Sequence, residues 1–121
     1  SDVYKRQLVD RPKETVCIDE SILPEDTTFG VRISGDSMEH EFHDGQIAWV
    51  LQQESVANGE IGIFSQNGEA YIKKLQNDKG GIFLISLNEK YAPIKVGEND
   101  RLDIFGKVLE KSNASAITGH C

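Results

Sequence analysis

The hydrophobic residues of this chain fall in short runs that are rich in β-branched and aromatic side chains. Turn-forming residues separate these runs, and they include Asp44-Gly45, Asn58-Gly59 and Lys79-Gly80-Gly81. Short runs at this spacing predict a mainly β domain, a partly open barrel or sandwich with very little helix. The predicted strands cover residues 31–34, 46–51, 61–65, 70–75, 82–87 and 102–109.

The pair Asn67-Gly68 lies between two of these runs. Both residues tolerate a positive φ, which a type I′ turn needs, so the pair predicts a hairpin that joins 61–65 to 70–75. Helix is limited to a single turn over residues 37–42 and a turn-like step over 21–24. Residues 112–121 are small and polar, and they are predicted to form a disordered tail.

The 121 residues suffice for a single core, so one domain is expected. The formal net charge is −7, whereas a free-standing DNA-binding domain is usually basic. No helix-turn-helix pattern is visible. We therefore expect any DNA recognition to depend on a region that is absent from this sequence.

Membrane insertion and secretion find no support in the sequence. No apolar run approaches the ~18 residues that a membrane helix needs, and no signal-peptide pattern is present. Cys17 and Cys121 are the only cysteines. Two free thiols in a reducing cytosol are expected, although one disulfide stays open as an alternative.

Ser37 and Lys73 are the candidate chemical groups. Ser37 follows Gly35-Asp36 on a predicted turn, where its hydroxyl would be exposed. Lys73 lies 36 residues later in an apolar strand, next to Ile72. A lysine can activate a serine if burial lowers its pKa toward neutrality, a change that costs roughly 3–5 kcal/mol for a pKa near 7–8. From the residues alone, a turn serine and a surface lysine are the simpler interpretation.

Strand alternation places Lys73 and Lys74 on opposite faces of their strand. Lys73 shares a face with Tyr71 and Leu75, and Lys74 shares the other face with Ile72. Both faces carry apolar neighbours, so periodicity does not decide which lysine is buried.

These residues resemble the S24 peptidase family, which comprises the C-terminal self-cleaving domains of LexA-type and phage CI-type repressors and the UmuD proteins. The resemblance spans about residues 14–110, in family order. It rests on a serine motif, Gly35-Asp36-Ser37-Met38, and a lysine motif, Tyr71-Ile72-Lys73-Lys74-Leu75. Further matching segments are 31–34, which precedes the serine motif, 42–50, 58–63, 67–70, 84–88 with 91–94, and 104–108.

The resemblance implies a LexA-like peptidase fold and a Ser-Lys dyad. The family's catalytic lysine is the first of the lysine pair, so the resemblance assigns Lys73 as general base and Ser37 as nucleophile. The backbone N–H groups of Ser37 and of a neighbour such as Asp36 would form the oxyanion hole. Asp36 itself is otherwise a turn-forming aspartate. In the family the lysine is fully buried only when the cleavage segment folds over the site, which implies a conditional enzyme.

The expected substrate of such a domain is an Ala-Gly or Cys-Gly bond N-terminal to the serine, and neither pair occurs in this sequence. The chain would then begin at or after that bond, carry a replaced segment, or not cleave itself; a truncated or processed domain is our expectation. The expected organisation is an N-terminal arm over 1–13, a peptidase and dimerisation domain over 14–110, and a flexible tail over 111–121.

The resemblance also implies partners. The expected complex is a cytoplasmic homodimer paired through the run 102–109, with DNA bound only through a missing N-terminal helix-turn-helix domain. A RecA filament on single-stranded DNA would trigger cleavage and relieve repression. The alternative is a dimerisation module of a phage-type repressor, in which catalysis is unimportant and an antirepressor protein exerts control. A leader-peptide-type protease acting in trans is the third hypothesis.

No metal site and no cofactor are expected. His40 and His43 lie among Glu39, Glu41 and Asp44, but they fall on a turn without a further ligand cluster. Trp49, in an apolar run, is expected in the core or at a dimer interface.

Overall fold

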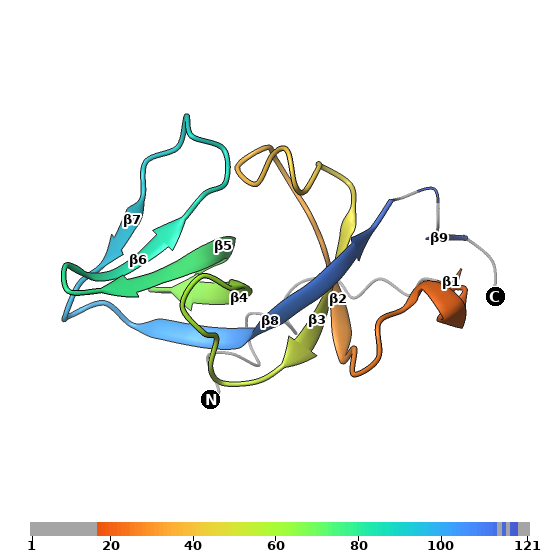
Figure 1. The fold of residues 1–121 in the computed structure, drawn as a ribbon, viewed down its shortest axis with the longest axis horizontal. Helices are drawn as coiled ribbons and strands as arrows, with labels where there is room; N and C mark the ends of the chain where they lie inside the picture. The colour runs from red at the N-terminus through yellow and green to blue at the C-terminus, as the bar shows by residue number, and fades with distance from the viewer. Residues whose placement is uncertain (1–16, 114, 116, 119–121) are drawn as a thin grey trace.

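The computed structural model of this chain describes residues 17–113, 115 and 117–118. Seven strands form one antiparallel sheet that curls into a half-barrel (Figure 1). The order across the sheet is β2-β3-β8-β4-β5-β6-β7. The bounds are β2 Phe29–Arg32, β3 Ile47–Gln52, β4 Ile61–Gln66, β5 Glu69–Asp78, β6 Gly81–Ile85, β7 Ile94–Val96 and β8 Leu102–Ser112. The mainly β prediction is confirmed.

Three smaller elements complete the described residues. β1 (Cys17–Ile18) pairs with β9 (Ile117–Thr118) as a separate two-stranded sheet. A 3-10 turn, η1 (Glu20–Ile22), follows β1, and the side chain of Asp19 caps it by accepting a hydrogen bond from the Ser21 N–H. The predicted arm over 1–13 and Cys121 lie outside the described residues.

The six predicted strands all exist, with shifted ends. β7 is not anticipated by the sequence, because its three residues form a strand only by pairing with β6. β8 continues to Ser112, into the predicted tail, because Lys111 and Ser112 pair with Ala48 and Ile47 of β3.

The predicted hairpin between β4 and β5 is confirmed. Asn67 and Gly68 have φ values of 51° and 90°, as a type I′ turn requires. Ladder pairs run from Gln66 opposite Glu69 to Ile61 opposite Lys74. This register places Gly62 opposite Lys73.

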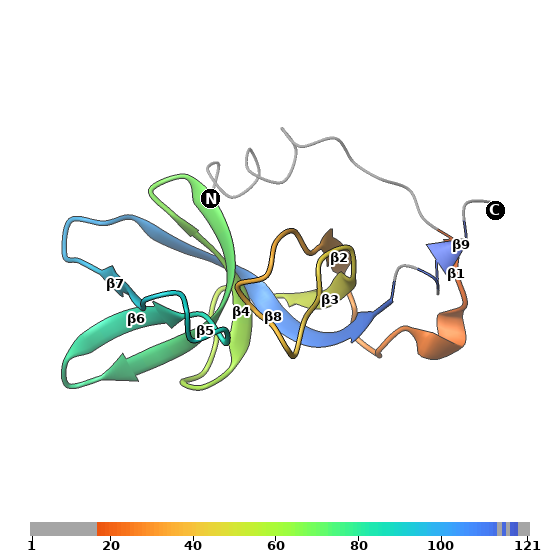
Figure 2. The same ribbon diagram turned by 90° about the horizontal axis from the view of Figure 1, so that it is seen from above.

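β8 connects the two halves of the curled sheet, as its long diagonal course shows (Figure 2). Residues from Gly106 to Ser112 pair with β3, and residues from Leu102 to Lys107 pair with β4. One hydrophobic cluster lies on the β2-β3-β8 side and includes Met38, Phe42 and Phe105. A second cluster lies on the β4-β7 side.

The position of β8 bears on the expected dimer. Its middle residues are hydrogen-bonded to strands on both sides, and each end has a described strand on one side only. The two open edges therefore lie on opposite sides of β8. Pairing of two copies along the whole run 102–109 would need β3 or β4 to move away.

Gly106 of β8 pairs with Gln52 of β3 on one side and with Ile63 of β4 on the other. We expect this position to tolerate no side chain. A Cβ atom there would meet the Leu51 carbonyl oxygen and lie 2.6 Å from Cγ1 of the buried Val50. We expect Gly106→Ala to lower the free energy of unfolding by about 1–3 kcal/mol or more, measured by urea denaturation. The control is Gly80→Ala, whose nearest neighbour would be the Asp78 side chain at 3.2 Å. Equal effects of the two substitutions would contradict the prediction.

No helix in the described part of the chain is both long and apolar enough to cross a membrane.

Candidate active site

Ser37 lies on a turn in the connection between β2 and β3. Gly35, with φ of 86°, opens the turn, and its N–H donates to the Asp44 carboxylate at 2.8 Å. The Glu39 N–H donates to the Asp36 carbonyl at 3.1 Å, which closes the turn around Ser37. Met38, the next residue, is 1% exposed in the hydrophobic cluster. The turn is thus anchored in the core and leaves Ser37 half-buried.

Lys73 lies in the middle of β5 and its side chain is buried, with 6% of its surface exposed. Lys74 is exposed, so the structure resolves the question that strand periodicity leaves open. Burial lowers the pKa of Lys73 from its ordinary value, because the charged form loses its hydration. In the described part of the protein, no carboxylate lies within ion-pair distance of its amine.

The structure brings the two candidate residues together. Lys73 Nζ lies 2.9 Å from Ser37 Oγ, within hydrogen-bond distance. The Tyr71 ring lies on the same face, with its centroid 5.6 Å from Nζ. A buried amine without a carboxylate partner is easier to deprotonate, and its neutral form can accept the proton of the serine hydroxyl.

The amide groups predicted for an oxyanion hole are on the same turn. Among the described residues, the N–H group of Ser37 has no hydrogen-bond acceptor, whereas that of Asp36 interacts with its own carboxylate. The carbonyl groups of these two residues do have partners, since both accept hydrogen bonds from Asn88 at 3.0 Å. The Ser37 N–H group therefore remains available to a bound oxyanion.

The sequence pattern gives no sign of a second set of contacts at this turn. The Asp36 carboxylate accepts a hydrogen bond from the Tyr91 hydroxyl and pairs with Lys90 Nζ at 2.7 Å. The hydrogen bond from Lys90 and that from Tyr91 lower the pKa of Asp36. Both partners belong to the connection between β6 and β7, more than fifty residues away, so only the fold reveals them.

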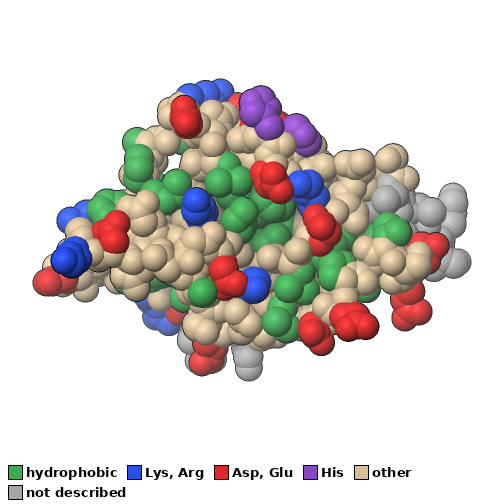
Figure 3. All heavy atoms as spheres, viewed as in Figure 1, with side chains coloured by type: hydrophobic (Ala, Val, Ile, Leu, Met, Phe, Trp, Pro, Cys, Tyr) green, Lys and Arg blue, Asp and Glu red, His purple; other side chains and the backbone are tan. Residues whose placement is uncertain are grey.

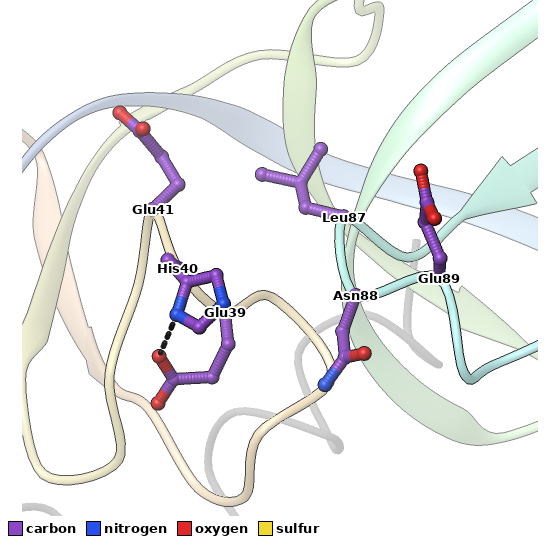
Figure 4. Close-up of a pocket in the computed structure, with 6 residues that line it drawn as sticks. All are labelled: Glu39, His40, Glu41, Leu87, Asn88 and Glu89. Carbon is purple, nitrogen blue, oxygen red and sulfur yellow. Dashed lines mark ion pairs between the residues drawn. The ribbon is translucent and has the colours of Figure 1, made fainter.

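An open hollow of about 610 Å³ lies beside the turn (Figure 4). Its lining is mostly polar and acidic: Glu39, His40, Glu41, Leu87, Asn88 and Glu89. His43 Nδ1 lies 2.6 Å from the Glu39 carboxylate, whereas His40 is 3.6 Å from it. No group of three potential metal ligands occurs in the residues that the structure describes.

The face of the molecule seen in Figure 1 has apolar side chains at its centre and charged side chains around them (Figure 3). Trp49, expected in the core or at an interface, is 5% exposed and its indole N–H donates to Ser112 Oγ at 2.8 Å.

Comparisons with known proteins agree on one family. The family model described as Peptidase S24-like matches residues 4–109. The LexA repressor of Carboxydothermus hydrogenoformans is 37% identical over 109 residues, which cover 88% of this chain and 52% of that protein.

Two further relatives give the same result. The LexA repressor of Acetivibrio thermocellus is 34% identical over 84% of this chain and 47% of its own length. LexA repressor 2 of Pseudomonas putida is 33% identical over 69% of this chain and 42% of its own. The chain thus spans about half the length of the curated relatives it matches.

Proposed function

Since this chain belongs to the peptidase S24-like family, we propose that it is the self-cleaving peptidase and dimerisation half of a LexA-like transcriptional repressor. One observation carries the proposal: the Ser37 hydroxyl lies 2.9 Å from a buried lysine amine that has no carboxylate partner among the described residues. An ordinary surface lysine would be charged and solvated, and it could not act as a base at neutral pH.

In the proposed reaction, neutral Lys73 accepts the hydroxyl proton while Ser37 Oγ forms a bond to the scissile carbonyl carbon. The electron pair of the carbonyl moves to its oxygen, which the N–H group of Ser37 stabilises together with that of a neighbour on the turn. When the C–N bond breaks, the Lys73 ammonium returns its proton to the leaving amine. Water then attacks the acyl carbon while Lys73 accepts its proton, the C–Oγ bond breaks, and Lys73 returns the proton to Ser37 Oγ.

The proposed substrate is an Ala-Gly-type bond in a segment upstream of Ser37 in the full-length protein. Cleavage there would separate an N-terminal DNA-binding half from this half and relieve repression in the cytoplasm. A RecA filament on single-stranded DNA is the proposed trigger, and a homodimer is the proposed assembly. Control by an antirepressor without cleavage is the competing outcome of the tests below.

The pH dependence of self-cleavage in the full-length protein tests the proposal. The base must be neutral, so the rate should rise with pH and level off above the pKa of Lys73. Because burial lowers this pKa, the midpoint should lie below the ordinary lysine value of 10.5. Gel electrophoresis after incubation between pH 6 and 11 measures the rate. If no cleavage occurs at any pH, with or without activated RecA, the chain is a regulatory dimerisation module and the proposal is wrong.

A further inference from the structure

We infer that Asn88 is a positioning residue for the proposed nucleophile, and that with Lys90 and Tyr91 it forms a clamp on the Ser37 turn. This inference rests on the proposed function of Ser37 and Lys73. Asn88 donates two hydrogen bonds to consecutive carbonyls: its backbone N–H to the Ser37 oxygen and its side-chain Nδ2 to the Asp36 oxygen, both at 3.0 Å.

These two bonds fix the directions of the adjacent N–H groups. A trans peptide is planar, and its C=O and N–H point in opposite directions. Holding the Asp36 carbonyl therefore aims the Ser37 N–H away from Asn88. Since this N–H has no acceptor among the described residues, the clamp keeps it oriented for an oxyanion before any substrate binds.

The clamp also connects the two parts of the sheet that carry the reacting groups. Ser37 follows β2, on one side of β8, and Lys73 belongs to β5, on the other side. β6 is hydrogen-bonded to β5 next to Lys73, with Lys74 opposite Ile85, and Asn88 comes three residues after that strand. Asn88 thus fixes the position of Ser37 relative to the strand pair that holds Lys73.

Three contacts hold the clamp itself in shape. Asn88 Oδ1 accepts a hydrogen bond from the Lys90 N–H at 3.2 Å, which forms a local turn. That turn presents Lys90 Nζ and the Tyr91 hydroxyl to the two oxygens of the Asp36 carboxylate.

Asn88→Asp is the sharpest test, because aspartate has the same shape and keeps an oxygen for the Lys90 N–H. It loses the Nδ2 donor and places a carboxylate against the Asp36 carbonyl. The readout is the reaction of Ser37 with a fluorophosphonate probe, in which the Oγ–P bond forms, fluoride leaves and Lys73 takes the hydroxyl proton. We expect the rate at high pH, where Lys73 is neutral, to fall by about 10- to 100-fold.

Asn58→Asp is the matched control, since it adds the same charge and also keeps its oxygen, which accepts the Asn77 N–H at 2.9 Å. Its labelling rate should stay within about twofold of wild type. Asn88→Ala, which adds no charge, should lower the high-pH rate but leave the pH midpoint of labelling unchanged, because Lys73 stays equally buried. A moved midpoint in Asn88→Ala would mean that Asn88 acts on the lysine, and the inference would be wrong.

The remaining outcomes are also decisive. If Asn88→Asp folds and reacts as fast as wild type, Asn88 does not position Ser37. If both Asn88 variants fail to fold, Tyr91→Phe, an exposed position that loses one hydrogen bond to Asp36, should slow labelling about two- to tenfold; no change would overturn the clamp. If wild-type Ser37 reacts at no pH, the proposed function fails and the inference fails with it.

Discussion

Replacing Ser37 with alanine is expected to abolish self-cleavage of the full-length protein and all labelling by a fluorophosphonate. The substitution removes the only group at this turn that can form the acyl bond, and loss of a serine nucleophile lowers turnover by about 10⁴- to 10⁶-fold in comparable enzymes. The turn should persist, because Met38 and Phe42 anchor it in the core and its backbone hydrogen bonds do not involve the hydroxyl. Mass spectrometry of the probe adduct and gel analysis of cleavage measure the two effects.

The matched control is Ser34→Ala, three residues earlier on the same connection and exposed. Its labelling and cleavage should equal those of wild type. Persistent cleavage in the Ser37 variant, or an adduct on another residue, would contradict the assignment of Ser37. Unchanged repression and induction in cells that carry Ser37→Ala would instead support the alternative of a dimerisation module under antirepressor control.

Replacing Lys73 with methionine is expected to eliminate the reaction and to stabilise the fold. Methionine has a similar length, so it fills the same buried space without a charge to desolvate. Below the folded-state pKa of Lys73, each unit by which burial lowers that pKa corresponds to about 1.4 kcal/mol of lost stability, which the substitution restores. The midpoint temperature of thermal unfolding should rise by several degrees, while the labelling rate of Ser37 falls by at least about 100-fold.

The stability difference between Lys73→Met and wild type should depend on pH with a defined sign. A lysine whose pKa is lower in the folded state binds fewer protons there than in the unfolded state, so wild-type stability rises with pH. The rise begins near the folded-state pKa and ends near 10.5, above which the difference should no longer change with pH. The comparison with methionine removes the contributions of all other titrating groups.

Lys74→Met is the control for both effects, because Lys74 is the next residue on β5 and is exposed. It should change neither the labelling rate nor the pH dependence of stability. If Lys73→Met and Lys74→Met had the same pH dependence, Lys73 would be solvated in solution and could not serve as the base.

Local patterns were sufficient for most of the sheet. The residues Asn67 and Gly68 can adopt the positive φ values of a tight hairpin, so the pairing of β4 with β5 follows from two adjacent residues. The apolar runs in the sequence likewise predict β3, β4 and β5. β7 could not be predicted, because three residues carry too little periodicity and its stability comes from its partner strand.

The candidate site, like the sheet, could be predicted from the sequence only in part. The order of motifs along the chain identified Ser37 and Lys73 as candidates through a family resemblance, and their residue types define the chemistry they could perform. Strand alternation separated Lys73 from Lys74 but did not say which side faces inward. That choice depends on how the sheet curls, because burial is a property of the layers that cover a strand and not of the strand itself.

The sequence by itself determined most of the strand pattern and the hairpin, since each depends on neighbours a few positions apart, and the order of its motifs singled out Ser37 and Lys73 as candidates. Tertiary structure alone decided that the hydroxyl of Ser37 and the amine of Lys73 meet at 2.9 Å, and that Asn88 donates hydrogen bonds to the carbonyls of Asp36 and Ser37. Contacts over 36 and 52 positions leave no periodic trace, because they arise when separate strands are brought side by side in one curled sheet.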